Sequence, residues 1–582
     1  MTEKKVLWFP WSKKAFQRAK DLDRPILLAI SAVWCHWCHV MDQTTYSNRD
    51  VAKLIREKFV PIRVDRDKRP DIDKRYNMGG WPTTAFLTPD GEVITGATYI
   101  PPQQMKLLLQ SIHRFYYKNK DNIKAKLKEI ETEEKKASSI EYGPDHRFFQ
   151  SIVDSLTLEI GSNFDSLHGG FGNSPKFPQS GALALALLEY RIQGHKSLLN
   201  IVTKTLKKMS AGGIYDKEEG GFFRYSTKRD WSIPHYEKMC EDNAKLLVNY
   251  LEAYQVTEEE TFKEVAQGIL TYVDATLSER DSGGFYGSQD ADEEYYKLSR
   301  LERRKRAPPR IDKTLYTNWN AMMVSAYLLA SVVLKNLSYR KFALRTVDLL
   351  LEKSFSSRKG MYHYYFRGKR YLPGLLTDQA SMIRCLIDVY QSTSERKILN
   401  YAESIAKFTL NNLWNNAGGF YDRPKKAEAL GALKTFDKPL DENSLAADVF
   451  LRLHRLTGKE KYLEPARRTL EHFASRYQRY SILAVTYGLA VELYLRPVQI
   501  HIVGPKKGSR TSRFLDESLR IYNPLKVIEI LDPDIDNERL RNLKYPITKT
   551  QMAYVCFEGN CTPVENPEGI AEIIELKRSG KG

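Results

Sequence analysis

The chain has 582 residues, too many for one ordinary domain, and we expect two or three domains that each bury a sizeable core. Its composition, 42% hydrophobic and 28% charged, is typical of a globular protein. The sequence contains no apolar run of about 18 residues, so no membrane span is predicted. The formal net charge of +18 invites nucleic-acid binding, but the densest basic stretch, 297–313, accompanies no recognised nucleic-acid module and has no interleaved aromatic side chains. We therefore expect neither nucleic acid nor a membrane as a partner.

The cysteines suggest the redox setting. There are six, and the chain begins with a polar segment at 1–5 rather than an apolar leader. We therefore expect a reducing, cytoplasmic location, where a closely spaced cysteine pair is catalytic or metal-binding rather than structural. Cys240 and Cys385 fall in helical patterns, which predicts buried core thiols. Cys556 and Cys561 are close enough in sequence to pair, and the sequence leaves that pairing open.

The first predicted elements are a strand at 25–31 and a helix that opens on Cys35-His36-Trp37-Cys38. A Cys-x-x-Cys pair between a strand and a helix is how thioredoxin-like folds present a reactive thiol pair. Backbone N–H groups and the dipole at a helix N-terminus favour a thiolate, so we expect the pKa of Cys35 to lie below the free value of about 8.5. We predict that Cys35 attacks, that Cys38 resolves the mixed disulfide, and that His36 favours the thiolate.

The segments that follow support a thioredoxin-like domain. Three further strands and a closing helix are predicted at 60–65, 84–88, 92–94 and 103–115. Gly80-Trp81-Pro82 lies where thioredoxin-like proteins carry a cis-proline facing the thiols, so Pro82 is assigned to the redox site. These elements predict an α/β thioredoxin-like domain over 1–125, followed by a charged helical linker over 126–145.

Three other interpretations of the cysteine motif stay open on the sequence alone. Cys35 to His39 also matches the Cys-x-x-Cys-His pattern of haem attachment, which requires export and an axial ligand. A metal site built from the two cysteines with His36 or His39 lacks a second Cys/His pair nearby to complete four ligands, so we predict no metal. The third alternative is a buried, inert cysteine pair.

After residue 145 the pattern changes to amphipathic helices, which continue to 496. Twelve segments, in six successive pairs, are predicted to begin near residues 146, 181, 196, 241, 262, 319, 339, 378, 396, 443, 461 and 480. A glycine–aromatic turn recurs between the members of several pairs, at 169–171, 220–222, 283–285, 360–362 and 418–420. This recurrence favours six helical hairpins closed into an all-α (α/α)6 toroid over 146–496, with an open helical solenoid as the alternative.

Polar and aromatic residues cluster at the predicted starts of alternate helices, where a helix that only packs in a core would carry apolar residues. In a closed toroid these starts converge on one end of the axial funnel, which makes them candidates for a binding pocket. The candidate pocket residues are His235, Glu237, Asp242, Asn243, Asp290, Asp292, Trp319, Asn320 and Asp378. Asp242, Asp378 and Ser444 have a second interpretation, as helix N-caps that each stabilise by about 1 kcal/mol.

The composition of this pocket favours acid–base chemistry on a sugar. Paired carboxylates beside a histidine are the parts of acid–base catalysis, a role assigned to His235, Glu237, Asp290 and Asp292. Aromatic rings such as Trp319 are suited to stacking on a sugar face. In a glycosidase, the carboxyl separation would then decide between retention and inversion.

The tail returns to alternating strands and helices. Strands are predicted at 498–503, 526–531 and 553–557, and helices at 512–521 and 568–576. We therefore expect a small α/β segment over 497–582 that packs on the toroid rather than acting alone.

Ordered sequence motifs along most of the chain resemble those of one family. They are Cys-His-Trp-Cys-His-Val-Met at 35–41, Val-Asp-Arg-Asp-Lys-Arg-Pro-Asp at 64–71, Gly-Gly-Trp-Pro at 79–82, Phe-Leu-Thr-Pro-Asp-Gly at 86–91, Gly-Asn-Ser-Pro-Lys-Phe-Pro at 172–178, Pro-His-Tyr-Glu-Lys-Met at 234–239, Gln-Asp-Ala-Asp at 289–292 and Asn-Trp-Asn-Ala-Met at 318–322. In these motifs the chain resembles the thioredoxin-domain proteins related to spermatogenesis-associated protein 20 and the bacterial YyaL-type proteins. The resemblance implies a thioredoxin-like domain fused to a six-hairpin toroid similar to N-acylglucosamine 2-epimerases and six-hairpin glycosidases. It implies no settled reaction.

The chain departs from this family pattern in three places. The stretch between Asp65 and Gly79 is shortened ahead of the proline turn, and a long insertion of the relatives is missing between Asp292 and Arg303. The segment 442–444, Glu-Asn-Ser, replaces a turn of the Ser-Gly-Asn-Ser type. These departures reshape the wall beside the thiols and the funnel, so the resemblance does not transfer one specific substrate.

The sequence therefore supports three functions. The first is a thiol–disulfide oxidoreductase that acts on protein disulfide substrates or redox partners and uses no cofactor. The second is a carbohydrate-processing enzyme, epimerase-like or glycosidase-like, with a sugar ligand in the toroid. The third is a binding scaffold whose thiols report the redox state.

Overall fold

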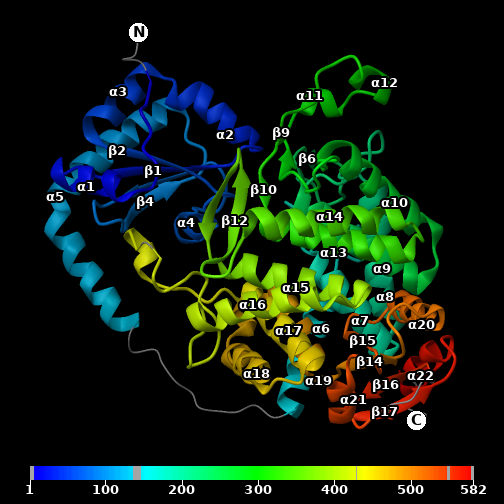
Figure 1. Cartoon of the computed structure of the whole chain (residues 1–582). Coiled ribbons are helices and arrows are strands. Elements are labelled where there is room, and N and C mark those ends of the chain that lie inside the picture. The colour runs from blue at the N-terminus through cyan, green and yellow to red at the C-terminus, as the bar shows by residue number, and fades with distance from the viewer. Residues whose placement is uncertain (1–4, 135–145, 428, 547–550, 579–582) are drawn as a thin grey trace. The chain divides into compact units, whose positions relative to one another are not determined.

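The computed structural model describes residues 5–134, 146–427, 429–546 and 551–578, and the chain forms two compact units (Figure 1). The first unit contains residues 1–143 with two short segments from later in the chain, 290–292 and 425–437. The second contains 144–289, 293–424 and 438–582. Part of the expected linker, 135–145, lies outside the described residues. Within the described residues, no helix combines the length and the apolar character needed to cross a membrane.

The first unit is built on a four-stranded sheet with the order β2-β1-β3-β4. Strand β1 runs parallel to β2 and antiparallel to β3, and β3 runs antiparallel to β4. The strand bounds are Ile26–Ser31 for β1, Val60–Asp65 for β2, Thr83–Leu87 for β3 and Val93–Ala97 for β4. This is the predicted thioredoxin-like sheet, and the fold-class expectation is confirmed for this unit.

Helices cover both faces of this sheet because alternate residues of β1 point to opposite sides. Ile26, Leu28 and Ile30 share one core with α1 and α4, whereas Leu27 and Ala29 share the other with α3 and α5. The helix bounds are Lys13–Asp21 for α1, His36–Met41 for α2, Arg49–Lys58 for α3, Pro70–Tyr76 for α4 and Pro102–Glu134 for α5.

The segment 425–437 completes the core on the α1–α4 face. Leu433 is buried there, and the Tyr76 hydroxyl accepts a hydrogen bond from the Ala432 N–H (2.7 Å) while donating to the Gly91 carbonyl (2.7 Å). Arg75 donates to the carbonyls of Ala432 (3.2 Å) and Thr435 (3.0 Å). These hydrogen bonds join residues 356–360 positions apart in sequence. The segment 425–437 is therefore part of this unit's hydrogen-bonded core.

The second unit contains the predicted toroid. Among the described residues six helices form an inner ring, namely α7 (Ser180–Gln193), α9 (Cys240–Thr257), α13 (Thr317–Val333), α15 (Leu376–Thr393), α17 (Leu440–Thr457) and α19 (Val485–Leu495). Each contacts the next, and α19 contacts α7, so the ring is closed and the open solenoid is excluded. The outer helices are α6 (His146–Asn163), α8 (Lys196–Ala211), α10 (Glu260–Tyr272), α14 (Leu337–Ser354), α16 (Arg396–Asn412) and α18 (Glu460–Ala474).

The pairing of these helices differs from the predicted pairing. Each of the inner helices α7, α9, α13, α15 and α17 packs closely against the outer helix that follows it, and α19 packs against α6. The glycine–aromatic turns therefore do not close the tight hairpins. They lie in the longer connections that lead from an outer helix to the next inner helix. The amphipathic pattern locates the helices but cannot tell which neighbours share the larger contact.

In four of these connections a buried amide side chain holds the residue that follows the glycine. At Asn443, Oδ1 accepts the Phe420 N–H (2.6 Å), while Nδ2 donates to the carbonyls of Phe420 (3.0 Å) and Pro439 (2.9 Å). The equivalent three bonds are made by Asn243 with Phe222 and Met239, by Asn320 with Phe285 and Tyr316, and by Gln379 with Met361 and Leu375. We call these four side chains the amide clamps.

The clamps correct two expectations. Asn243 and Asn320 were candidate pocket residues, but both are fully buried and their amides are occupied by backbone groups. The N-cap interpretation of Asp242, Asp378 and Ser444 is wrong, because the caps of α9, α15 and α17 are Met239, Leu375 and Pro439.

Glycine is required beside a clamp where the backbone passes close to a neighbour: Gly220 has φ +80°, and a Cβ there would lie 2.1 Å from the Gly268 carbonyl oxygen.

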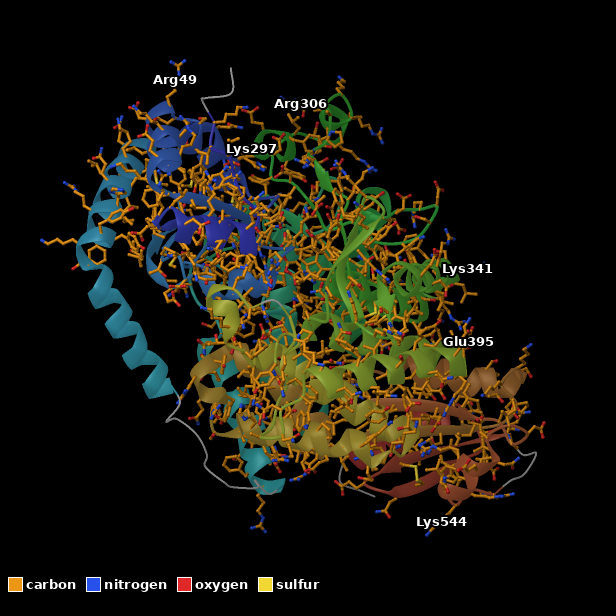
Figure 2. All side chains as sticks on the ribbon, turned by 60° about the vertical axis from the view of Figure 1, so that its left-hand side comes forward. Arg49, Lys297, Arg306, Lys341, Glu395 and Lys544 are labelled. Carbon is orange, nitrogen blue, oxygen red and sulfur yellow. A yellow bond between two sulfur atoms is a disulfide. The ribbon has the colours of Figure 1, made fainter. Side chains whose placement is uncertain are left out.

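The excursion at 293–306 carries the basic stretch. It contains α11 (Glu293–Tyr296) and α12 (Arg300–Arg303), and the side chains of Lys297 and Arg306 point into solvent (Figure 2). Arg303 is different: it is buried and donates to the carboxylate of Asp216 (2.7 Å) and to the Tyr296 carbonyl (2.6 Å). One of the basic residues is therefore a structural anchor for the excursion.

The tail forms a four-stranded sheet of its own with the order β15-β14-β16-β17. The strands are β14 (Val498–Val503), β15 (Lys526–Leu531), β16 (Met552–Phe557) and β17 (Asn560–Val564), with α20 (Ser509–Arg520), α21 (Asn537–Asn542) and α22 (Gly569–Arg578). Strand β14 is parallel to β15 and antiparallel to β16, and β16 is antiparallel to β17. These are the strand order and directions of the thioredoxin-like sheet. Contacts of β15 with α15 and α17, and of α20 with α13, confirm that the tail packs on the toroid.

The amide clamps make a stability prediction. Asn443→Ala removes three hydrogen bonds and leaves the buried N–H and carbonyl of Phe420 without this partner. We expect the free energy of unfolding, measured with urea, to fall by roughly 2–4 kcal/mol, and hydrogen exchange at the Phe420 amide to accelerate. Asn411→Ala on the exposed face of α16 is the control and should change the same free energy by no more than about 0.5 kcal/mol. Equal losses in the two variants would contradict the clamp.

The seam that closes the inner ring makes a pH prediction. Glu189 on α7 and Glu492 on α19 are both fully buried, and burial followed by the charge of Glu492 raises the pKa of Glu189 from 4.5 to about 8. Between pH 4.5 and about 8, Glu189 therefore keeps its proton in the folded state but loses it in the unfolded state. Stability should fall as the pH rises from 4.5 to about 8.

Glu189→Gln tests this contribution, because glutamine cannot ionise. We expect the variant to lose less stability across that pH range than the parent, by on the order of a few kcal/mol. Urea unfolding at pH 5 and pH 8 measures the difference. Glu264→Gln, at an exposed position on α10, should leave the parent's pH dependence in place, and a parent-like profile for Glu189→Gln would refute the assignment.

Candidate functional site

The cysteine pair lies where the sequence predicts it. Cys35 is the N-cap of α2, and it forms a disulfide with Cys38 on the first turn, with the two Cα atoms 5.2 Å apart. The Cys38 N–H points at the Cys35 sulfur (3.2 Å), and both residues are 3% exposed. On reduction this N–H and the helix dipole would stabilise a thiolate on Cys35.

Two tryptophans and a buried carboxylate form the scaffold beside the pair. Trp34 donates from its indole N–H to Asp67 (2.6 Å), and its ring packs edge-on against Trp81 (5.9 Å between centroids). The Arg66 guanidinium lies over the Trp81 ring at 4.4 Å. The peptide bond from Trp81 to Pro82 is cis, as the sequence predicts, and leads directly into β3.

The residues between and after the cysteines reach the surface. His36 is exposed, and Trp37 is 47% exposed although its ring rests on Tyr99 (5.2 Å). His39 faces Asp290, with Nδ1 3.8 Å from the carboxylate oxygen. Asp290 and Asp292 belong to the first unit, whereas their predicted partners His235 and Glu237 belong to the second. Among the described residues, no group of three or more His, Cys, Asp or Glu side chains has an arrangement that could hold a metal ion.

His235 and Glu237 lie together in the toroid. Nδ1 of His235 is hydrogen-bonded to Oε2 of Glu237, whose side chain is almost completely buried. The His235 ring stacks on Tyr225 (4.9 Å, 17° between planes), and Tyr225 stacks in turn on Phe177 (4.7 Å). Burial, together with the nearby charge of Glu237, raises the pKa of Tyr225 to about 12, so its hydroxyl stays protonated at neutral pH.

A second histidine–carboxylate pair was not predicted. His363 on β12 (Gly360–Phe366) places Nδ1 3.0 Å from both carboxylate oxygens of Asp378, and both residues are buried. Asp378 was a candidate from its place at the start of an inner helix. The only sequence signal for His363 was its position directly after the glycine–aromatic segment 360–362, which was predicted as a turn rather than as a strand.

Aromatic side chains adjoin this second pair. The Tyr316 ring lies 5.7 Å from His363 and 4.4 Å from Trp319, and the Tyr316 hydroxyl donates to Asp312 (3.1 Å). Trp319, a predicted stacking residue, is 5% exposed and packs on Tyr316. Asp242 is half-buried on the first turn of α9.

Comparisons with known proteins bear on the N-terminal domain and on the chain as a whole. Residues 1–134 match the model of the family Thioredox_DsbH, described as a protein of unknown function, DUF255. A 65-residue stretch, 11% of this chain and 58% of the relative, is 34% identical to thioredoxin-1 of Drosophila melanogaster. The human protein spermatogenesis-associated protein 20 is 26% identical over 706 aligned positions that cover 98% of this chain and 90% of that protein, and the rat protein of the same name is 28% identical.

Solved structures similar to the chain include a D-mannose isomerase, with 11% identity, 61% of this chain and 100% of that chain covered, and a TM-score of 0.49. A cellobiose 2-epimerase from Bacillus thermoamylovorans has 13% identity, 56% and 88% coverage, and a TM-score of 0.46. The resemblance found in the sequence motifs is thus confirmed: the chain is similar over almost its whole length to spermatogenesis-associated protein 20 and begins with a thioredoxin-like domain of the Thioredox_DsbH type.

Proposed function

We propose that the chain is a thiol–disulfide oxidoreductase that uses Cys35 and Cys38. The observation that carries this proposal is the geometry of Cys35, which caps α2 and receives the Cys38 N–H at 3.2 Å. A structural disulfide does not need this donor. A nucleophilic thiol does, because the donor stabilises the thiolate that attacks.

The reaction proceeds by two exchanges. In the reduced protein the Cys35 thiolate attacks one sulfur of a substrate disulfide, and the other substrate sulfur leaves as a thiolate. The Cys38 thiolate then attacks Cys35, which releases the reduced substrate and restores the Cys35–Cys38 disulfide. Two electrons pass from the protein to the substrate, and a dithiol reductant must return them for another cycle.

The surface around the pair supports a polypeptide substrate or redox partner. Trp37 exposes nearly half of its side chain next to the buried sulfurs, with exposed His36 beside it. A large, rigid aromatic at the surface is suited to contacts with apolar side chains of a protein.

The proposal predicts opposite phenotypes for the two cysteines. Cys35→Ser should abolish dithiothreitol-driven reduction of insulin, because it removes the nucleophile. Cys38→Ser should accumulate a mixed disulfide, detectable on a non-reducing gel, because the resolving thiol is gone. Cys385→Ala, which removes a buried thiol of the toroid, is the control and should retain parental activity.

Parental reduction of insulin by both single variants would refute the oxidoreductase. If Cys38→Ser captured a partner while the parent reduced no disulfide substrate, the binding scaffold would replace the enzyme as the function of this domain.

A second activity, carbohydrate processing in the toroid, is favoured by the two histidine–carboxylate pairs. In the His235–Glu237 pair the carboxylate orients the imidazole, and the stacked rings of Tyr225 and Phe177 lie beside it. An oriented imidazole can move a proton, and aromatic rings can face a sugar, so the arrangement suits epimerisation or hydrolysis.

Glu237→Gln tests this activity. It should retain binding of a sugar that the parent turns over, while turnover falls at least about 100-fold because the imidazole loses its charged partner. Screening of epimerase and glycosidase substrates identifies the sugar, and calorimetry measures its binding. Glu460→Gln, at an exposed position of α18, should behave as the parent. Failure of the parent to bind any screened sugar at millimolar concentration would exclude this second activity.

A further inference from the structure

The second disulfide of the chain lies in the C-terminal sheet. Cys556 on β16 faces Cys561 on β17 in the strand register, and the two form a disulfide with Cα atoms 4.0 Å apart. Cys556 is 4% exposed, whereas Cys561 is exposed. One sulfur-bearing residue is therefore open to an incoming reagent and the other is sheltered, which is the asymmetry that directed thiol exchange requires.

This location differs from that of the first pair although the two sheets share one topology. In the first sheet the cysteines follow β1 and open α2. In the C-terminal sheet the corresponding connection, 504–508 between β14 and α20, contains glycine, proline and lysine and no cysteine. The thiol pair of this domain lies instead on the hairpin of its last two strands. A helix N-terminus therefore cannot stabilise a thiolate here, and any stabilising hydrogen bond must come from side chains.

A chain of buried polar groups leads to the two sulfurs. The Tyr545 hydroxyl lies 3.1 Å from the Cys556 sulfur and 3.2 Å from the Cys561 sulfur. His501 on β14 places Nδ1 2.8 Å from the same hydroxyl, and its Nε2 lies 3.9 Å from Glu529 on β15. Arg539 donates to Glu529 (3.2 Å). Burying polar groups costs folding free energy, so a row of them beside a disulfide indicates a functional role.

The protonation state of His501 determines which way the hydrogen bonds between His501, Tyr545 and the sulfurs can run. Burial, with the nearby charge of Arg539, lowers the pKa of His501 to about 3, so the imidazole is neutral and carries one N–H. If that hydrogen is on Nδ1, it donates to the tyrosine oxygen, and the phenol hydrogen is directed at sulfur. The stacking of Tyr545 on Tyr554, at 4.0 Å, holds the phenol in place. The Tyr545 hydroxyl, 3.1 Å from the Cys556 sulfur, is thus within hydrogen-bonding distance of a thiolate that forms there.

A purely structural role explains little of this. The disulfide closes a loop of only a few residues, because the separation in sequence is five. The same strands are already joined by a two-residue turn at 558–559 and by backbone pairing on both sides of the cysteines. Since the entropic benefit of a cross-link grows with the length of the loop that it closes, a disulfide across so short a loop adds little constraint to the unfolded chain.

We infer that Cys556 and Cys561 form a second thiol–disulfide exchange site, separate from Cys35 and Cys38, which exchanges electrons with low-molecular-weight thiols of the glutathione class. The sulfur of Cys561, the exposed residue of the pair, receives the attack, and the Tyr545 hydroxyl stabilises the departing Cys556 thiolate. Tyr545 contacts the reacting sulfur directly, whereas His501 acts through Tyr545 as a positioning residue. This site goes beyond the function proposed for the N-terminal domain and does not depend on it.

The exchange balances in two steps. A glutathione thiolate attacks Cys561, the bond between the two cysteine sulfurs breaks, and Cys556 leaves as a thiolate, which gives a mixed disulfide between Cys561 and glutathione. A second glutathione thiolate attacks the glutathione sulfur of that mixed disulfide and releases Cys561 as a thiolate. Two glutathione molecules are oxidised to glutathione disulfide, and the protein disulfide is reduced to a dithiol. Oxidation of the dithiol by glutathione disulfide is the reverse.

The first experiment isolates this site in the full chain by combining Cys35→Ser with Cys38→Ser. The protein is equilibrated with mixtures of reduced and oxidised glutathione, and free thiols are counted by mass spectrometry after alkylation. We expect full and reversible conversion between disulfide and dithiol, with hydrogen exchange in β14 to β17 kept slow throughout. A disulfide that resists every mixture until these strands lose protection would overturn the inference.

The direction of attack is tested in the same background. Cys556→Ser should form a mixed disulfide between Cys561 and glutathione, whereas Cys561→Ser, which leaves the sheltered thiol, should form it at least about 10-fold more slowly. Equal rates in the two variants would contradict the assigned order.

The role of Tyr545 has a matched control in the neighbouring ring. Tyr545→Phe keeps the stacked ring but removes the donor, so the pKa of the Cys556 thiol, read from thiolate absorbance in the Cys561→Ser variant, should rise by roughly one unit, a factor of about 10. The rate of reduction of the disulfide should fall in parallel. Tyr554→Phe alters the ring on the other side of the same stack and should change neither quantity. An unchanged thiol pKa in Tyr545→Phe would contradict the role assigned to the Tyr545 hydroxyl.

Discussion

The toroid depends on satisfying the backbone at the connections that lead into its inner helices. In the four connections that carry an amide clamp the chain turns at glycine, and the residue that follows, Phe222, Phe285, Met361 or Phe420, is fully buried, so water cannot satisfy its N–H and carbonyl groups. A buried group left unpaired there would cost as much as several ordinary hydrogen bonds contribute. The clamps at Asn243, Asn320, Gln379 and Asn443 solve this with one side chain each, because a carboxamide presents an acceptor and two donor hydrogens at once.

Buried lysines reinforce the same connections. Lys238 is fully buried and donates to Asp216 (2.7 Å) and to the Gly220 carbonyl (2.8 Å), and Lys176 donates to Asp165 (2.7 Å). Burial lowers the pKa of Lys238 to about 8 against the opposing effect of Asp216. The motifs at 172–178 and 234–239, which carry part of the family resemblance, therefore contain residues that build the fold. A specific motif in a chain of this kind is not by itself evidence for a catalytic group.

The sequence was sufficient for what depends on local pattern. It located the Cys35–Cys38 pair, the strands of the first sheet, the inner and outer helices and three of the four tail strands, because periodicity and turn residues act over short distances. Strand β17 was not predicted. It could not distinguish a pocket residue from a clamp at Asn243, since a polar residue at the start of an inner helix suits both roles. It also gave no means of finding His363, whose partner Asp378 is brought to it only by the closure of the fold. The helix pairs were misassigned for the same reason, because contact area is a tertiary property.

The two sheets share one strand order, but their cysteine pairs lie at different positions, one at the start of a helix and the other on a hairpin. At Cys35 the stabilising donor is the backbone of α2, and any sequence that forms the helix supplies it. At Cys556 no helix begins, and a donor must come from side chains, which requires Tyr545, His501 and the buried carboxylate of Glu529 from three separate segments. Burial raises the pKa of Glu529 to about 7 and keeps His501 neutral, so the second arrangement depends on packing in a way that the first does not. A thiol pair on a hairpin is thus sensitive to the whole sheet around it, whereas a pair on a helix start depends on one turn.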